Sequence, residues 1–162
     1  MNQPSSFLRV ALGSGAIVGV LDAIAATLHA YAFLHIGPDL VFRFVASGAL
    51  GRAAITGGPH MIAAGLAFHF LFASAWTALF FLLARALPLP LRAAPTAAAL
   101  GAVYGLVIWL GMNLAVIPLS KIPSRPLHLT TPTLAMILIH VLVIGVPIAL
   151  LARRHLHRHL AR

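Results

Sequence analysis

Cysteine and glutamate are absent from the 162-residue sequence, and lysine occurs once, at Lys121. Without cysteine the chain has no disulfide, thiolate zinc site, iron–sulfur cluster or covalently attached c-type haem. The only acidic residues are Asp22 and Asp39, so the carboxylate pair of a glycosidase and the His-Glu-x-x-His helix of a zinc hydrolase are missing. The sequence also has no Gly-x-Ser-x-Gly elbow and no phosphate-binding loop. It therefore predicts no catalytic residues.

Charged residues of both signs are scarce. They make up 8% of the chain, while 61% of the residues are hydrophobic, against about 25% charged residues in an average soluble domain. This composition excludes an ordinary soluble protein. The formal net charge is +9, but the basic residues flank long apolar runs instead of lining a polar domain. That pattern indicates a membrane protein and no nucleic-acid partner.

Four apolar runs are long enough to cross a bilayer, for which about 18 residues suffice. The run between Arg52 and Arg85, for example, contains 32 residues and no charge. We therefore expect an all-α membrane protein, a four-transmembrane-helix antiparallel bundle that forms a single domain over residues 1–152. The first span is too long for the apolar part of a signal peptide and is expected to be retained. The spans are expected at about 7–36, 59–87, 95–119 and 131–152.

Positive charge is unequal at the two ends of the expected bundle. Seven arginines fall on the side of the termini, and three arginines with Lys121 fall on the other side. Because cytoplasmic loops carry the excess of Lys and Arg, we expect both termini in the cytoplasm. Residues 153–162 are expected to form a basic cytoplasmic tail that rests on the anionic headgroups of the bilayer. The alternative for this tail is a metal-binding His-x-His-x-His tract.

The connections between the spans differ in character. The first contains a segment at about 39–52 with polar residues four apart on one side and apolar residues on the other: Asp39, Arg43 and Ser47 against Leu40, Val41, Phe44 and Val45. This pattern predicts a short amphipathic helix in the outer interface, supported by an Asp39–Arg43 ion pair. The short, proline-rich second connection predicts that the second and third spans are antiparallel neighbours. Pro147 is expected to kink the last span.

Glycines four residues apart occur in two of the spans. Gly15 and Gly19 form a Gly-x-x-x-Gly pair in the first span, and Gly101 and Gly105 form another in the third. Such a pair lets a second helix approach closely. The sequence leaves open whether the partner helix belongs to the same bundle, to a second copy in a homo-oligomer, or to a larger membrane complex.

Polar side chains within the spans are the most informative feature for function. With about 1.5 Å of rise per residue, Asp22 falls near the midplane, and the other members of this intramembrane polar cluster fall in the outer half of the bundle: His29, His69, Asn113 and His140. An unpaired aspartate in hydrocarbon is costly, so Asp22 is expected to face the interior with His69 or His140 as its partner.

Three functions are compatible with this cluster. The favoured one is a non-enzymatic membrane protein whose cluster packs the bundle or moves a proton or a small polar solute. The second is an accessory or assembly subunit of a larger membrane complex, in keeping with the small size and the two Gly-x-x-x-Gly surfaces. The third is a b-type haem or metal-binding redox protein with His69 and His140 as ligands on facing helices. Apart from this haem, no cofactor is expected.

The chain resembles small bacterial inner-membrane proteins of the YagU-like group. The similar features are Asp22 after the glycine-rich start of the first span and the segments 46–51, 67–70, 112–120 and 140–147. The resemblance extends over most of the chain, but the motifs are loose and contain no established active site. It implies a bacterial inner-membrane protein with four spans and supplies no catalytic residues.

Overall fold

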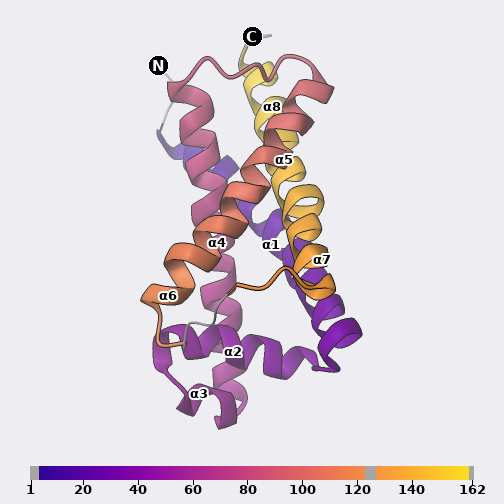
Figure 1. The fold of residues 1–162 in the computed structure, drawn as a ribbon. Coiled ribbons are helices and arrows are strands. Elements are labelled where there is room, and N and C mark those ends of the chain that lie inside the picture. The colour runs from indigo at the N-terminus through magenta and orange to yellow at the C-terminus, as the bar shows by residue number, and fades with distance from the viewer. Residues whose placement is uncertain (1–3, 123–126, 161–162) are drawn as a thin grey trace.

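The computed structural model describes residues 4–122 and 127–160, and this part of the chain forms helices and loops without a strand. Four helical rods make up the fold: α1 (Pro4–Leu34), α4 (Pro59–Ala86), α5 (Ala94–Gly111) continued by η1 (Met112–Val116) and α6 (Ile117–Leu119), and α7 (Thr131–Ile139) continued by η2 (His140–Gly145) and α8 (Val146–Leu160). They run antiparallel, so both ends of the chain lie at the same end of the bundle (Figure 1). The expected all-α bundle is confirmed.

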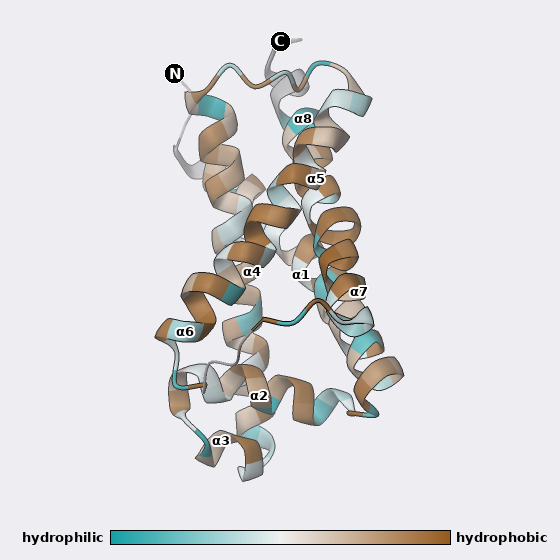
Figure 2. Ribbon diagram, viewed as in Figure 1, coloured by the Kyte–Doolittle hydropathy of each residue, from teal (hydrophilic) through white to brown (hydrophobic). Residues whose placement is uncertain are grey.

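Each rod contains a segment long and apolar enough to cross a membrane. The bounds lie within three residues of the expected spans: Phe7–Leu34, Pro59–Ala86, Ala94–Leu119 and Thr131–His155. Apolar residues predominate along all four rods, and hydrophilic ones gather towards their ends (Figure 2). Proline stands in the first turn of α4, α5 and α7, where its missing N–H costs no helical hydrogen bond. The sequence therefore marks the start of these rods.

Two further prolines account for irregular turns inside the third and fourth rods. Pro118 and Pro147 each lie two residues beyond a π-helical segment, η1 and η2 respectively. A proline inside a helix donates no hydrogen bond, and its ring clashes with the carbonyl group four residues earlier. The preceding turn is wider as a result, and the N–H of Val146 bonds to the carbonyl of Val141, five residues back. The kink expected at Pro147 thus takes the form of a widened turn, a feature that often occurs at functional sites.

The rods associate as two close pairs, α1 along α4 and α5 along η2 and α8. Glycines lie at both contacts. A Cβ atom on Gly15 would come within 2.7 Å of the Ser74 Cα, and one on Gly101 within 2.5 Å of the Gly145 carbonyl oxygen. Gly19 faces Phe70, and Gly105 faces the backbone of His140. Both Gly-x-x-x-Gly pairs therefore pack against helices of the same chain.

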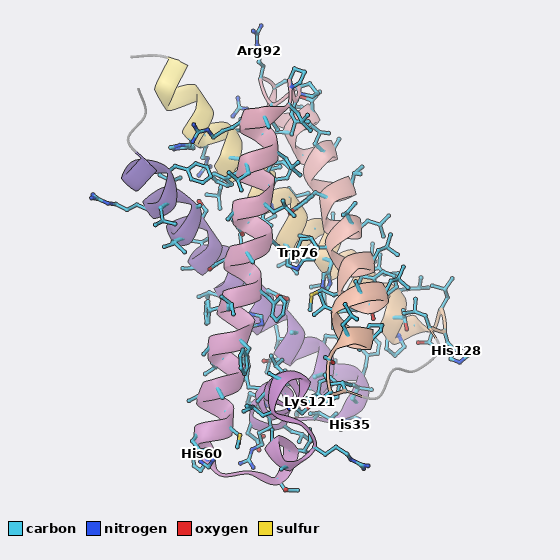
Figure 3. The ribbon with its side chains drawn as sticks, turned by 90° about the vertical axis from the view of Figure 1, so that its left-hand side faces the viewer. His35, His60, Trp76, Arg92, Lys121 and His128 are labelled. Carbon is cyan, nitrogen blue, oxygen red and sulfur yellow. The ribbon has the colours of Figure 1, made fainter. Side chains whose placement is uncertain are left out.

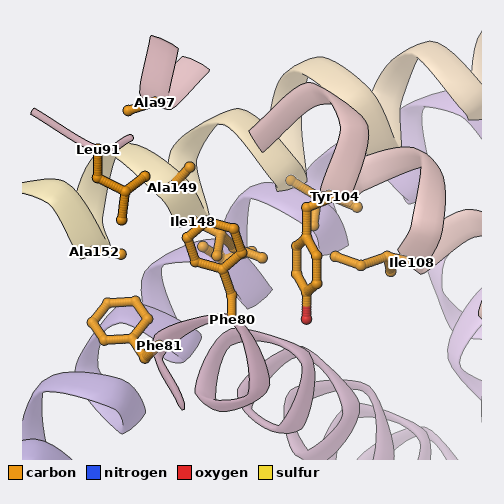
Figure 4. Close-up of a cluster of buried hydrophobic side chains, with 11 residues drawn as sticks. Phe80, Phe81, Leu91, Ala97, Tyr104, Ile108, Ile148, Ala149 and Ala152 are labelled. Carbon is orange, nitrogen blue, oxygen red and sulfur yellow. The ribbon is translucent and has the colours of Figure 1, made fainter. Parts of the chain in front are cut away.

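Aromatic side chains fill the space between the two pairs. The Tyr104 hydroxyl donates a hydrogen bond of 2.7 Å to the carbonyl oxygen of Trp76, and its ring lies 4.8 Å from that of Phe80. The second and third spans thus meet through large side chains, whereas glycines mediate the close contacts within each pair. Tyr104 and Phe80 belong to the hydrophobic core of the bundle, which Figure 4 shows. The buried residues of this core are Val18, Phe80, Phe81, Leu91, Ala97, Tyr104, Ile108, Ile144, Ile148, Ala149 and Ala152. Most of this core occupies the half of the bundle nearer the termini.

Helix α2 (Pro38–Leu50) lies across the opposite end of the bundle and leads into the short α3 (Ala53–Thr56) (Figure 1). It buries Phe42, Ala46 and Ser47, and the Phe42 backbone fits against Gly65 of α4 so closely that a Cβ atom there would collide with it. Gly65 therefore makes the docking of α2 on α4 sterically feasible.

Two expected features of α2 are wrong. Ser47, placed on its polar side by the sequence pattern, is buried. The Asp39–Arg43 ion pair does not form, because a guanidinium nitrogen of Arg43 donates to the carbonyl oxygen of Gly57 instead. Within residues 4–122 and 127–160, the one contact between a carboxylate oxygen and a basic nitrogen within 4 Å joins Asp22 and His69. Docking on α4 thus buries part of the side of α2 that the sequence pattern marks as polar, and the placement of α2 in the membrane interface stays a prediction.

The expected basic tail begins as a helix. Helix α8 continues without a break from the last span through Arg153 and Arg154 to Leu160. Of the three histidines in the His-x-His-x-His tract, His155 lies beside the ring of Phe81, at 6.1 Å between ring centroids. The other two side chains and residues 161–162 lie outside the part that the structure describes, so the metal-binding alternative stays a prediction.

Candidate functional site

A cavity of about 110 Å³ lies between the two helix pairs. Residues of α1, α2, α4, α5, η1, η2 and α8 line it, among them Asp22, His69, Trp76 and His140. Figure 3 places Trp76 midway between Arg92 at one end of the molecule and His60 at the other. The cavity is therefore in the middle of the bundle.

The two ends of the cavity are closed by different elements. Four of its lining residues also belong to the apolar core, which fills the bundle towards the termini: Val18, Ile108, Ile144 and Ile148. On the opposite side, α2 contributes Val45 to the lining, and the neighbouring Phe42 meets the His69 ring edge-on at 6.0 Å between centroids. The cavity thus has an apolar base on the side of the termini and is covered by α2 on the other.

Asp22 and His69 face each other across the contact between α1 and α4. The Asp22 Oδ2 and the His69 Nε2 are 3.8 Å apart, beyond the usual range of a hydrogen bond. The same Nε2 lies 2.9 Å from the carbonyl oxygen of Gly19. Because a carbonyl oxygen can only accept, His69 carries a proton on Nε2 and donates it there. The sequence favours this arrangement, since Gly19 has no side chain to hold the helices apart.

His140 approaches the cavity from the other helix pair, at the first residue of η2. Its Nδ1 lies 2.9 Å from the carbonyl oxygen of Met136 and therefore donates a hydrogen bond to it. In the neutral ring the proton is thereby fixed on Nδ1, and Nε2 keeps its lone pair. Both imidazoles lie within electrostatic range of the Asp22 carboxyl group. Three proton-exchanging side chains from three rods therefore surround one cavity.

The carboxyl group of Asp22 has space beside it. It accepts no hydrogen bond from the residues that the structure describes, and its nearest basic atom is the His69 nitrogen at 3.8 Å. With about 30 Å³ per water molecule, the cavity volume of about 110 Å³ corresponds to three or four waters. A polar pair separated by more than about 3.5 Å is commonly bridged by water. The arrangement is suited to holding and exchanging a proton.

The other two members of the predicted cluster have different partners. The His29 Nε2 donates to the carbonyl oxygen of Pro132 at 2.8 Å, and this bond ties the end of α1 to the start of α7. Asn113 donates through Nδ2 to the carbonyl oxygen of Trp109, 2.9 Å away in its own rod. Neither side chain lines the cavity. The structure thus brings together Asp22, His69 and His140 and places His29 and Asn113 elsewhere.

Sequence reasoning finds one of the glycines that shape the site and misses the other, together with the helix that covers the cavity. Gly65 lies four residues before His69 and so shares its helix face, and in the structure it admits the Phe42 backbone. Gly145 lies directly against Gly101 and Gly105, and no spacing in the sequence marks this contact. Nor does any marked signal place Val45 of α2 at the cavity.

One of the three hypotheses from the sequence is a b-type haem protein in which His69 and His140 bind the haem. His69 and His140 do line the same cavity, but its volume of about 110 Å³ is well below the roughly 300–1,000 Å³ of pockets for larger ligands. A haem between them would require the two helix pairs to separate. Although Asp22, His69 and His140 line this cavity, the described residues include no group of three such side chains placed so that they could hold a metal ion. The haem hypothesis stays a prediction, and a Soret band that is lost in His69→Ala or His140→Ala would support it.

The four apolar rods define an integral membrane protein. Comparison with known proteins adds no relative, since no family model, curated protein or solved structure matches this chain. Membership of the YagU-like group therefore stays a prediction. The functional argument rests on the geometry of the cavity.

Proposed function

We propose that this integral membrane protein moves protons across the membrane by way of the cavity formed by Asp22, His69 and His140. One observation carries the proposal. The Asp22 carboxyl group lines the same cavity as two imidazoles, this cavity has room for water, and the carboxyl group accepts no hydrogen bond from the described residues. Ionisable side chains within spans are costly and typically mark ion pathways and proton relays.

A purely structural role explains the cavity less well. Polar groups that serve only to join helices find their hydrogen-bond partners on neighbouring side chains or backbone groups, so none of them is left without one. Here His69 and His140 each direct one nitrogen to a backbone carbonyl group, and neither hydrogen-bonds to Asp22. The imidazoles are thereby held in fixed orientations around a carboxyl group that stays open to the cavity. Fixed rings beside an open acid are suited to proton transfer.

The nature of the lining also favours a proton over other cargo. Calcium takes six to eight oxygen ligands, and magnesium takes six in an octahedral arrangement. The ionisable side chains of the lining are one carboxyl group and two imidazoles, and most of the remaining surface is apolar. A volume of about 110 Å³ restricts a polar solute to a few heavy atoms. A proton carried on these side chains and on water needs no larger space.

The proposed orientation follows the distribution of arginine. Both termini lie in the cytoplasm of a bacterial cell, as the excess of positive charge at that end favours. The apolar base of the cavity then lies towards the cytoplasm, and α2 covers its outer side. The proton must pass α2 and the apolar core, so local opening of one side at a time is part of the proposal.

The experiment is a flux measurement on the purified full-length chain. The protein is reconstituted into vesicles that enclose a pH-sensitive dye, and a potassium gradient with valinomycin sets the membrane potential. We expect internal pH to change several-fold faster than in protein-free vesicles made from the same lipid. Equal rates in the two preparations would contradict the proposal.

A further inference from the structure

Helix α2 covers the cavity with few attachments to the rest of the molecule. Of its 13 residues, Phe42, Ala46 and Ser47 are buried, and the Ser47 hydroxyl group donates its hydrogen bond to a carbonyl oxygen within α2 itself. The opposite side of the cavity is closed by the apolar core, in which Val18 and Ile148 are fully buried. The cavity is therefore enclosed more weakly at the end of the bundle opposite the termini.

Both flanks of α2 contain a residue with left-handed backbone. His35 has a φ angle of 54° and Gly51 one of 83°, a region that residues other than glycine uncommonly adopt. The chain changes direction at both positions, so α2 lies across the rods instead of continuing α1 (Figure 1). Hinges are typically a few loop or element-terminal residues that absorb changes in backbone angles. The two flanks of α2 are suited to this role.

Two hydrogen bonds hold α2 in place between these flanks. The Arg43 guanidinium group donates to the carbonyl oxygen of Gly57, which follows α3. The backbone N–H of Lys121 donates to the Gly48 carbonyl oxygen at 2.8 Å, and this bond joins α2 to the loop after α6. Figure 3 places Lys121 at the same end of the molecule as His35. Neither bond involves a residue of the four rods, so both can break while the helix pairs stay packed.

We propose that α2 is the lid of the proton path at the end opposite the termini. The lid opens when α2 turns away from α4 about His35 and Gly51. This movement takes Phe42 off the His69 ring, which it meets edge-on in the closed structure, and water outside the membrane then reaches Asp22. The apolar core keeps the other side of the cavity closed. The inference rests on the proposed proton movement, to which it adds the element that opens and the contacts that must break.

Because the chain has no cysteine, the lid can be locked with a single engineered disulfide. A Cβ atom on Gly48 would lie 3.7 Å from the Ser120 Cβ, within the range of about 3.5–4.5 Å between the Cβ atoms of a disulfide. In the double variant Gly48→Cys, Ser120→Cys, the flux in the vesicle assay should fall several-fold on oxidation and recover when dithiothreitol reduces the bond. Mass spectrometry after alkylation of the free thiols measures the locked fraction.

The single variants Gly48→Cys and Ser120→Cys are the matched controls, and oxidation should leave their flux unchanged. Equal flux in the oxidised and reduced double variant would overturn the lid and leave the proton movement standing. Failure of the two thiols to couple would also overturn the lid, since α2 would then not lie against Ser120. Absence of flux in the unaltered protein would instead contradict the proposed function, and a second measurement tests the lid without flux.

The second measurement compares the reactivity of two buried cysteines in the full-length chain. Ala46 in α2 and Ala97 in α5 are both 0% exposed, so the closed structure protects both positions equally. In mild detergent, a polar maleimide should label Ala46→Cys several-fold faster than Ala97→Cys, because only position 46 is uncovered when α2 turns away from α4. Thermal denaturation curves check that both variants are folded. Equal labelling rates would overturn the lid whatever the flux.

Discussion

Replacing Asp22 with asparagine is expected to abolish the proton flux and leave the protein folded. Asparagine has the shape of aspartate and remains polar towards the cavity, but it cannot take up or release a proton. The Gly19–His69 hydrogen bond, at 2.9 Å, does not involve the Asp22 side chain and should persist. In the vesicle assay the rate for Asp22→Asn should fall to that of protein-free vesicles.

The chain offers a closely matched control for this substitution. Asp39 is the other acidic residue, and it is exposed at the start of α2. Asp39→Asn makes the same chemical change outside the cavity and should leave the flux unchanged. A flux in Asp22→Asn equal to that of the unaltered protein would show that the carboxyl group carries no proton.

A second variant keeps the proposal testable if Asp22→Asn fails to fold. In His140→Gln the side-chain amide can still donate to the Met136 carbonyl group, which His140 bonds at 2.9 Å, but it does not titrate. The flux should fall substantially in this variant also. Unchanged flux would remove His140 from the pathway and reduce the relay to Asp22 and His69.

The sequence predicts the membrane architecture because hydropathy and charge are sufficient to define spans. Long uncharged runs, prolines at helix starts and arginines at the margins are all local features, and each marks a boundary directly. Depth along a span is also nearly fixed by the rise per residue. It places Asp22, His69 and His140 in one predicted cluster with His29 and Asn113, and the structure brings the first three to one cavity.

The sequence does not determine how each helix is rotated about its own axis. Nor does it determine which acceptor each polar side chain finds among its neighbours. His29 is predicted within the cluster, but its ring N–H donates to the carbonyl group of Pro132 in the first turn of α7. Asn113 bonds to a carbonyl group of its own rod. For α2, the amphipathic pattern does not indicate that the helix docks on α4, where Gly65 leaves room for the Phe42 backbone. Each outcome depends on a neighbour that only the tertiary structure supplies.

The packing of η2 on α5 is expected to be the most sensitive contact in the bundle. A Cβ atom on Gly105 would lie 2.8 Å from the Val141 Cα and still closer to the carbonyl group of His140. These are backbone atoms, so no side chain can rotate away to make room. Gly105→Ala should therefore destabilise the protein by about 3 kcal/mol, at the upper end of ordinary overpacking. The measurement is the midpoint of unfolding in detergent, by heat or by added dodecyl sulfate.

Gly13→Ala is the matched control, since a Cβ atom on Gly13 meets nothing within 4 Å. Alanine is the better helix former, so this variant should be unchanged or more stable by up to about 1 kcal/mol. Equal stability of the two variants would contradict the close α5–η2 contact. The same contact positions His140, because the residue begins η2 and its carbonyl group faces Gly105. If the proposed relay is right, Gly105→Ala protein that still folds should also move protons more slowly, whereas Gly13→Ala should not.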